Sequence, residues 1–170
     1  MLSNHAPLTP APQALVADLM RAKGWLLATA ESCTGGLIAA ACTELAGSSV
    51  WFERGFVSYA NEAKTEMLGV DAALILTHGA VSEPVVRAMA LGALGHSRAQ
   101  VALAVTGVAG PSGGSKGKPV GTVWFGWSVQ GQLSSERKHF AGDRAAVRAA
   151  TVQHALSTLA ILLARCKVSG

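Results

Sequence analysis

The sequence predicts an α/β protein: a single three-layer α/β/α sandwich around a mixed, mostly parallel sheet with an antiparallel hairpin. Short apolar stretches of strand length alternate with helix-like stretches along the chain, which is the order of elements in such a sandwich. Towards the C-terminus, two β-rich stretches flank Gln130-Gly131-Gln132, a pattern that is typical of a hairpin. Both observations point to one sheet covered by helices.

One domain accounts for the chain. Its 170 residues match the size of an ordinary domain, half of them are hydrophobic, and no internal repeat is present. We expect the domain over residues 13–167 and a flexible leader over residues 1–12, which contains three prolines. The leader has no basic segment followed by an apolar run, so it does not resemble a signal peptide. No segment reaches the roughly 18 apolar residues that span a bilayer, and we expect no membrane partner.

Charge and cysteine content argue against several classes of function. The net charge is +4, but the basic residues are scattered and no nucleic-acid-binding motif is present, so no nucleic-acid partner is expected. The three cysteines are odd in number and lack C-x-x-C spacing, which disfavours a disulfide framework and a zinc site and fits the cytoplasm. Four tryptophans in a small apolar domain indicate self-association, and we expect a homo-oligomer, a dimer or higher.

The first elements are a helix and a strand–turn–helix unit. Apolar residues recur at helical spacing over residues 15–23, and Gly24 is expected to end this helix. Residues 25–30 form an apolar run of strand length, and residues 37–45 are alanine-rich and helix-like. Residues 31–36 between them are therefore a tight turn from strand to helix.

A second strand and two helices are predicted next. Residues 50–60 carry the aromatic and β-branched residues of a strand. Asn61 is expected to cap a helix over residues 62–68 that Gly69 ends. Ser82 is expected to cap a further helix, whose inner side carries Val85, Val86, Met89 and Ala93.

The second half of the chain supplies the centre and the end of the sheet. Residues 100–106 are almost continuously apolar, which predicts a central strand buried on both faces. Residues 107–119 hold five glycines and form a long loop, after which residues 120–129 and 133–141 form the hairpin. Asp143 begins a closing helix, whose predicted buried residues are Val152, Leu156, Leu159 and Leu163.

Ser32 stands where the first strand turns into a helix. Gly35 and Gly36 behind it let the backbone approach a ligand closely. The N–H groups at the helix start could bind a phosphate or stabilise an oxyanion, which makes the Ser32 hydroxyl a candidate nucleophile. The spacing equally fits an ordinary helix cap at Ser32 or Thr34, so the turn alone leaves both interpretations open.

Cys33 is a competing nucleophile in the same turn, because a helix N-terminus lowers the pKa of a thiol. Catalytic cysteines normally rely on a histidine base, and the sequence pattern assigns none of the five histidines to Cys33 as such a base. Simple packing of a small side chain is the alternative.

Tyr59 and Lys64 lie on either side of a predicted strand-to-helix junction, with Asn61 between them. Both side chains can reach the end of the sheet where Ser32 lies. A partly desolvated lysine can act as general base for a serine, and a tyrosine can hold or pass the proton. On its own, a lysine in a first helical turn is usually a solvated charge. Tyr59 and Lys64 therefore indicate catalysis only in combination with Ser32.

The glycine-rich loop over residues 107–119 suits a phosphate or a ribose, because it offers a run of backbone N–H groups. Its segment from Gly113 to Gly117 matches G-x-S-x-G, but a strand follows instead of a helix, which argues against Ser115 as nucleophile. No histidine or carboxylate cluster has the spacing of metal ligands, and we expect no metal and no other cofactor.

Five blocks of the sequence, in matching order, resemble the CinA C-terminal family. They are Thr29 to Gly36, Ala46 to Ser49, Gly55 to Lys64, His78 to Ser82 and Thr106 to Pro111. The resemblance runs from about Leu15 to about Leu163. Stand-alone members of this family convert nicotinamide mononucleotide and water to nicotinate mononucleotide and ammonia in pyridine-nucleotide recycling, without a metal. The resemblance therefore implies a cytoplasmic amidohydrolase that acts on a small nucleotide.

The resemblance also implies roles for individual residues. Ser32 is the implied nucleophile, Lys64 and Tyr59 are its proton-transfer partners, and Ser48 and Thr106 supply hydroxyls that line the substrate. The remaining expected substrate contacts are Thr34, Gly35, Gly36, Asn61, Gly107 and Gly110, with Arg144 and Arg148 as candidates for phosphate contact.

Two departures from the family pattern concern substrate preference. Ala60 stands where a hydroxyl residue is common, and Ser112 stands where an acidic residue is common.

Without the resemblance, two other classes of function must be weighed from the residues alone. A nucleotide sensor would need neither Lys64 nor Tyr59, and a serine–lysine peptidase or β-lactam acyltransferase would show an S-x-x-K spacing that is absent here.

Overall fold

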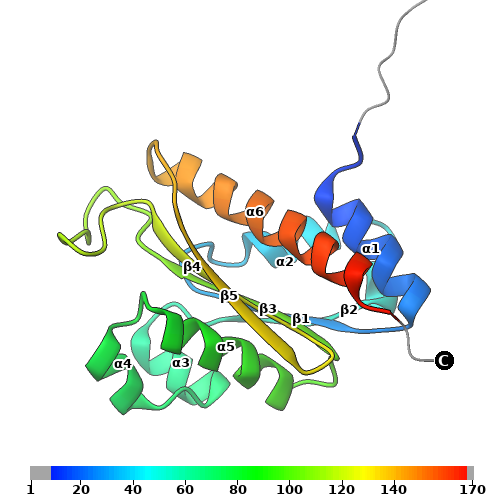
Figure 1. Cartoon of the computed structure of the whole chain (residues 1–170), viewed down its shortest axis with the longest axis horizontal. Helices are drawn as coiled ribbons and strands as arrows, with labels where there is room; N and C mark the ends of the chain where they lie inside the picture. The colour runs from blue at the N-terminus through cyan, green and yellow to red at the C-terminus, as the bar shows by residue number, and fades with distance from the viewer. Residues whose placement is uncertain (1–8, 168–170) are drawn as a thin grey trace, which may run out of the picture.

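The computed structural model describes residues 9–167, which form a five-stranded sheet between two layers of helices (Figure 1). The strands are β1 (Leu27–Glu31), β2 (Phe52–Val57), β3 (Val101–Gly107), β4 (Thr122–Val129) and β5 (Gln132–His139). Their order in the sheet is β2-β1-β3-β4-β5. Strands β2, β1 and β3 are parallel, whereas β4 is antiparallel to both of its neighbours. The predicted mixed sheet with a hairpin is confirmed.

Three helices cover each face of the sheet (Figure 1). Helices α1 (Pro12–Lys23), α2 (Leu37–Thr43) and α6 (Arg144–Arg165) lie on one face. Helices α3 (Asn61–Leu68), α4 (Ala72–His78) and α5 (Glu83–Gly95) lie on the other. A short 3-10 turn, η1 (Ser48–Val50), precedes β2. This arrangement is the predicted three-layer sandwich.

The two faces of the sheet carry side chains of different size. On β3, Leu103 belongs to the large core shared with α1 and α6, whereas Ala104 faces α5. Gly126 of β4 extends the face of small residues, and a Cβ there would lie only 3.0 Å from the carbonyl oxygen of Val86 in α5. Helix α5 therefore packs closely on the sheet because little side-chain volume lies beneath it.

Helix α6 closes the opposite face. The carboxylate of its N-cap, Asp143, accepts a hydrogen bond from the Ala146 N–H at 2.9 Å. The indole N–H of Trp127 in β4 donates to the Ala155 carbonyl at 3.1 Å and ties the helix to the sheet. By length and composition α6 could cross a membrane, but it has the buried inner face of a core helix. Of its predicted inner residues, Leu156, Leu159 and Leu163 are buried and Val152 is partly buried.

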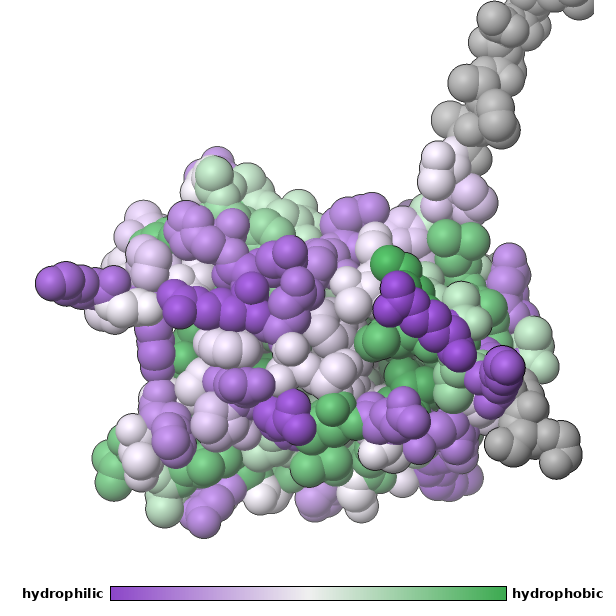
Figure 2. All heavy atoms as spheres, in the orientation of Figure 1, coloured by the Kyte–Doolittle hydropathy of each residue, from purple (hydrophilic) through white to green (hydrophobic). Residues whose placement is uncertain are grey.

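Strand β5 forms one edge of the sheet and carries hydrophilic side chains along its length, at the front of the view in Figure 2. Glu136, Arg137 and Lys138 follow one another in this strand. Charged side chains on an edge strand oppose pairing with a foreign strand. The hairpin thus ends the sheet on this side.

Several details of the prediction are wrong. Helix α4 was not predicted at all. Asn61 is the first residue of α3 and not its cap, because Ala60 holds the N-cap position and no side chain caps this helix. Ser82 precedes α5 as expected, but its hydroxyl donates to the Gly79 carbonyl at 2.7 Å instead of capping the helix. Strand β2 is shorter than predicted, since it ends at Val57.

The predicted leader lies only partly within the described residues. Its residues 1–8 lie outside the described residues, and its last residue, Pro12, is the first residue of α1. The predicted end of α1 at Gly24 is confirmed.

Candidate active site

The candidate site begins where β1 and β2 end at the same edge of the sheet. Glu31 of β1 pairs with Val57 of β2 on one side and with Val105 of β3 on the other. The Ser32 N–H donates to the Val105 carbonyl at 3.1 Å, and the Ser58 N–H donates to the Glu31 carbonyl at 2.9 Å. The first residues after both strands are therefore held in place by backbone hydrogen bonds at this edge.

Lys64 reaches this edge from α3 and is almost completely buried, with 1% of its surface exposed. Its Nζ lies 3.0 Å from Ser32 Oγ. The same nitrogen lies 2.9 Å from the Ser58 carbonyl oxygen and 3.1 Å from the Tyr59 carbonyl oxygen. Three oxygen atoms thus surround the amine, and one of them is the predicted nucleophile.

Burial lowers the pKa of Lys64, because the charged ammonium loses its hydration. A neutral amine has two N–H bonds and one lone pair. The carbonyls of Ser58 and Tyr59 can accept the two N–H bonds, which leaves the lone pair for the Ser32 hydroxyl proton. This geometry suits a general base that acts on a serine.

The turn after β1 is held from inside the protein by Glu31. Its carboxylate accepts hydrogen bonds from the Thr34 hydroxyl at 2.6 Å, the Ile38 N–H at 2.8 Å and the Ala39 N–H at 2.9 Å. The protein's own carboxylate therefore occupies the start of α2. These two N–H groups are therefore already bonded within the protein and are not free to bind a phosphate.

Arg148 holds the same turn from the side of α6. Its Nε donates to the Cys33 carbonyl and its Nη2 donates to the Thr34 carbonyl, each at 3.2 Å. Both contacts are with the protein backbone, and Arg148 does not line the cavity beside Ser32. In the described structure Arg148 therefore holds the backbone and does not face the cavity, and its contact with a substrate phosphate stays a prediction.

A cavity of about 360 Å³ opens beside Ser32 and Lys64. Its volume lies in the range of small-molecule sites. Its walls come from the turn after β1, the start of α3, the loop before α5, the loop after β3 and the start of α6. The structure brings together eight of the predicted site residues around it: Ser32, Tyr59, Asn61, Lys64, Thr106, Gly107, Gly110 and Arg144.

The other predicted site residues lie elsewhere. Thr34 is fully buried and its hydroxyl is bonded to Glu31, while Gly35 and Gly36 shape the turn with φ angles of 58° and 102°. Ser48 precedes β2, whose first residue pairs with the first residue of β1 at the opposite edge of the sheet. Roughly 15–20 Å of strand separates that edge from Ser32. Ser48 therefore does not line the cavity within one chain.

Tyr59 lines the cavity, and its part in proton transfer stays a prediction. The residue is 56% exposed, and its hydroxyl oxygen accepts a hydrogen bond from Arg144 Nη2 at 2.9 Å. Arg144 Nη1 also donates to the Gly110 carbonyl at 2.9 Å. The backbone carbonyl of Tyr59, and not its hydroxyl, contacts Lys64. The phenol is thus part of the cavity wall that Arg144 joins to the glycine-rich loop.

Cys33 is a poor nucleophile in this environment. Burial raises the pKa of its thiol to about 12, although the charges of Lys64 and Arg148 act in the opposite direction. Almost no thiolate is present at neutral pH under these conditions. The electrostatics favour Ser32 over its neighbour.

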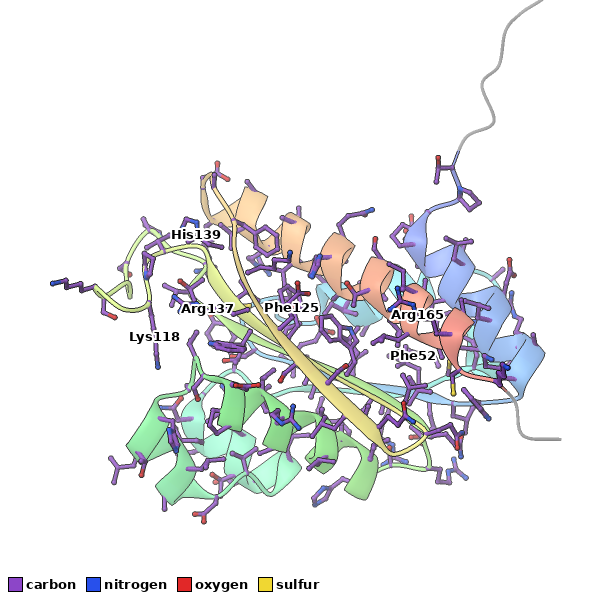
Figure 3. All side chains as sticks on the ribbon, viewed as in Figure 1. Phe52, Lys118, Phe125, Arg137, His139 and Arg165 are labelled. Atoms are coloured by element: carbon purple, nitrogen blue, oxygen red, sulfur yellow. The ribbon has the colours of Figure 1, made fainter. Side chains whose placement is uncertain are left out.

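The glycine-rich loop is anchored at several points (Figure 3). Lys118 Nζ donates to the His78 carbonyl at 2.7 Å, and Arg137 Nη2 donates to the Gly117 carbonyl at 2.9 Å. His139 Nε2 lies 2.9 Å from the Val120 carbonyl oxygen. These contacts hold the base of the loop, while Ser115 is exposed and does not line the cavity.

Two elements of the site were missed by sequence reasoning. The sequence analysis predicts no role for Glu31, although an acidic residue at the end of an apolar strand and just before a helix is a signal for internal capping. The loop before α5 also contributes, because Thr106 Oγ1 donates to the Ala80 carbonyl at 2.8 Å and Val81 lines the cavity.

Comparison with known proteins gives consistent matches. A family model described as the CinA C-terminal domain matches residues 10–163. A protein of Escherichia coli K12 named nicotinamide-nucleotide amidohydrolase PncC is 53% identical over 145 residues, which cover 85% of this chain and 88% of that protein. A protein of the same name from Pseudomonas putida is 56% identical over 131 residues, with coverage of 77% and 82%.

The fold also matches solved structures. The crystal structure of the competence damage-inducible protein A from Klebsiella pneumoniae superposes with a TM-score of 0.89 at 44% sequence identity. The superposition covers 92% of this chain and 97% of the Klebsiella chain. Sequence and backbone therefore agree over almost the whole described region.

Proposed function

The chain belongs to the CinA C-terminal domain family, and from this premise we propose that it is a nicotinamide-nucleotide amidohydrolase. The proposed reaction converts nicotinamide mononucleotide and water to nicotinate mononucleotide and ammonia. Support comes from relatives of that name whose match spans most of both chains. The single observation that carries the proposal is the 3.0 Å contact between Lys64 Nζ and Ser32 Oγ. Both residues line a cavity whose volume is in the range of small-molecule sites.

In the proposed first step, Ser32 Oγ attacks the carboxamide carbon and its proton passes to Lys64 Nζ. The C–N bond of the tetrahedral intermediate then breaks, and the nitrogen leaves as ammonia after it takes the proton from Lys64. The product of this step is an ester between Ser32 and the nicotinoyl group. The ester carries the nucleotide part of the substrate unchanged.

In the second step, water attacks the ester and gives a proton to Lys64. The bond to Ser32 breaks, the proton returns to Ser32 Oγ, and nicotinate mononucleotide is released. Lys64 serves as base and acid in turn, which requires a pKa closer to neutrality than that of an ordinary lysine. The burial of Lys64 acts in that direction.

Arg144 is the proposed contact for the nucleotide phosphate. It lines the cavity, whereas Arg148 does not. A guanidinium presents a fork of donors that matches a phosphate. In the described structure this fork is engaged with Gly110 and Tyr59, so binding would extend or exchange these contacts.

We also propose a cytoplasmic location. Cys33, Cys42 and Cys166 are all free thiols, which is in keeping with a reducing compartment.

The experiment that tests the function is ammonia release from nicotinamide mononucleotide by the purified protein. We expect release by the parent and loss of release in Ser32→Ala, with nucleotide binding retained in the variant. A Cys42→Ala variant serves as control, because Cys42 lies in the core away from the cavity. Nucleotide binding without ammonia release by the parent would reject the enzyme and favour a sensor.

A further inference from the structure

Two arginines project from the first turns of α6, four residues apart, and they have different partners. Arg144 contacts the glycine-rich loop and Tyr59, which are walls of the cavity. Arg148 contacts the Cys33 and Thr34 carbonyls, which follow Ser32 directly in the chain. Residues four apart lie on the same side of a helix, so one side of α6 touches two separate parts of the site.

The turn that Arg148 contacts needs external support. Gly35 and Gly36 both adopt positive φ angles, and glycine restricts the backbone less than any other residue. Ser32 precedes these glycines, so the position of its hydroxyl depends on how firmly the turn is held. Glu31 holds the inner side through the Thr34 hydroxyl and the start of α2.

Arg148 supplies the corresponding support on the outer side. Thr34 is held twice, by its hydroxyl on Glu31 and by its carbonyl on Arg148. The two carbonyls bound by Arg148 belong to consecutive residues, so a planar guanidinium fixes the direction of both peptide groups at once. A Cβ at Gly35 would lie 3.4 Å from Arg148 Nη2, which shows how closely the side chain lies against the turn.

We propose that Arg148 is a positioning residue for Ser32: by binding the two carbonyls after the nucleophile, it keeps Ser32 Oγ in contact with Lys64. This inference rests on the proposed function for its kinetic test. It also differs from the role that the family resemblance implies, which is contact with the substrate phosphate. The charge of Arg148 is close enough to act on the neighbouring Cys33 thiol, in the direction that favours negative charge at the turn.

The proposal makes a specific kinetic prediction. In Arg148→Ala, we expect kcat to fall by about 10–100-fold, the scale of a small misplacement of reacting groups, with KM within about threefold of the parent. Arg148→Lys should lose most of the same rate, because one ammonium cannot bind two carbonyls as a fork does. Added guanidinium should partly restore kcat in Arg148→Ala. A rise in KM with kcat retained would overturn the proposal and make Arg148 a substrate contact.

Arg144→Ala is the matched comparison, since it removes an arginine one helical turn away that faces the cavity. We expect its main effect on KM for the nucleotide. Melting temperatures would establish that each variant is folded, and Arg148→Lys retains the test if Arg148→Ala does not fold. Equal kinetic changes in the Arg144 and Arg148 variants would argue against separate roles.

A second measurement separates this proposal from the proposed function. Phenylmethanesulfonyl fluoride modifies activated serines without any nucleotide, so its rate of reaction with Ser32 reports the state of the nucleophile directly. We expect slower modification in both Arg148 variants than in the parent and in Arg144→Ala. Normal modification in the Arg148 variants would reject the positioning role, whereas a reactive parent that releases no ammonia would reject only the substrate. A parent that neither reacts nor releases ammonia would reject both.

Discussion

At the scale of single residues, the buried amine of Lys64 connects the chemistry of the site with the stability of the fold. Burial lowers its pKa in the folded protein, whereas the unfolded chain keeps the ordinary value near 10.5. Between these two values the unfolded chain binds more protons than the folded one, so the free energy of unfolding rises with pH. At lower pH both forms are protonated, and the cost of a buried ammonium is fully present.

We therefore predict a difference between the parent and Lys64→Met in their dependence on pH. As the pH rises towards the ordinary lysine pKa of 10.5, the parent should gain stability relative to the variant, because only the parent carries this group. Denaturant unfolding at several pH values measures the difference. Parallel stability curves for the two proteins would mean that the pKa of Lys64 is not lowered by folding.

Burial acts on Cys33 in the opposite direction, because it raises the pKa of the thiol and so lowers its reactivity. Its thiol is buried and its pKa is raised to about 12, so it should neither catalyse nor react readily. We expect Cys33→Ala to keep most of the parent's rate of ammonia release, and we expect thiol reagents to leave the parent active. An inactive Cys33→Ala beside an active Ser32→Ala, both folded, would place the chemistry on the thiol.

Arg144 controls substrate choice if it binds the phosphate. Arg144→Ala should lose kcat/KM for nicotinamide mononucleotide by about 10-fold or more, mainly through a rise in KM, since the variant lacks a charged contact with the phosphate. The same variant should act on nicotinamide riboside about as well as the parent does, because that compound has no phosphate. Steady-state kinetics on both compounds decide the point, and an equal loss on both would assign Arg144 to the cavity wall alone.

At the scale of elements, the position of α3 determines where Lys64 lies. The end of α3 packs on α5 at Gly92, where a Cβ would overlap the carbonyl oxygen of Leu68. Gly95, at the end of the same helix, has no atom within 4 Å of a Cβ. The two glycines therefore provide a matched pair on one helix.

Gly92→Ala should push α3 away from α5 and lower the free energy of unfolding by about 1–3 kcal/mol, the usual cost of overpacking. Activity should fall as well, because Lys64 moves with α3. Gly95→Ala should be neutral or slightly stabilising, since alanine favours a helix. Denaturant unfolding with an activity assay measures both effects, and similar behaviour of the two variants would contradict the close packing at Gly92.

The same scale shows how far the sequence could predict the structure. Elements with clear periodicity or a run of apolar residues, such as α6 and β3, were located correctly, because burial alone explains their pattern. Helix α4 was missed since it is short, although Asp71 caps it through the Ala73 N–H. The sequence also predicted that Ser32 lies in the turn after the first strand and that Lys64 lies in the helix after the second.

The part of the site that the sequence does not show consists of long-range side-chain contacts. Two glycines before a helix leave an anion site open, but Glu31 bonds to the helix start from inside the protein. The family resemblance makes Arg148 a candidate for phosphate contact, yet the partners of Arg148 in the structure lie more than a hundred residues earlier in the chain. Short-range sequence patterns cannot predict such contacts, because the contacts depend on how α6 packs against the sheet.

At the scale of the whole molecule, the surface bears on self-association. The edge at β5 carries charged side chains (Figure 2), which opposes extension of the sheet by a second copy there. The homo-oligomer that the composition suggests stays a prediction. Light scattering of the purified protein would decide it.

The contact between Arg148 of α6 and the turn after Ser32 has a consequence for the synthesis of the protein. The ribosome makes α6 last of the described elements, more than a hundred residues after the turn that Arg148 supports. Contacts between segments so distant in the chain form late, because loop closure must come first. An incomplete chain would therefore carry Ser32 and Lys64 without the last support of the nucleophile. Full activity would then appear only after α6 has been made and has packed on the sheet.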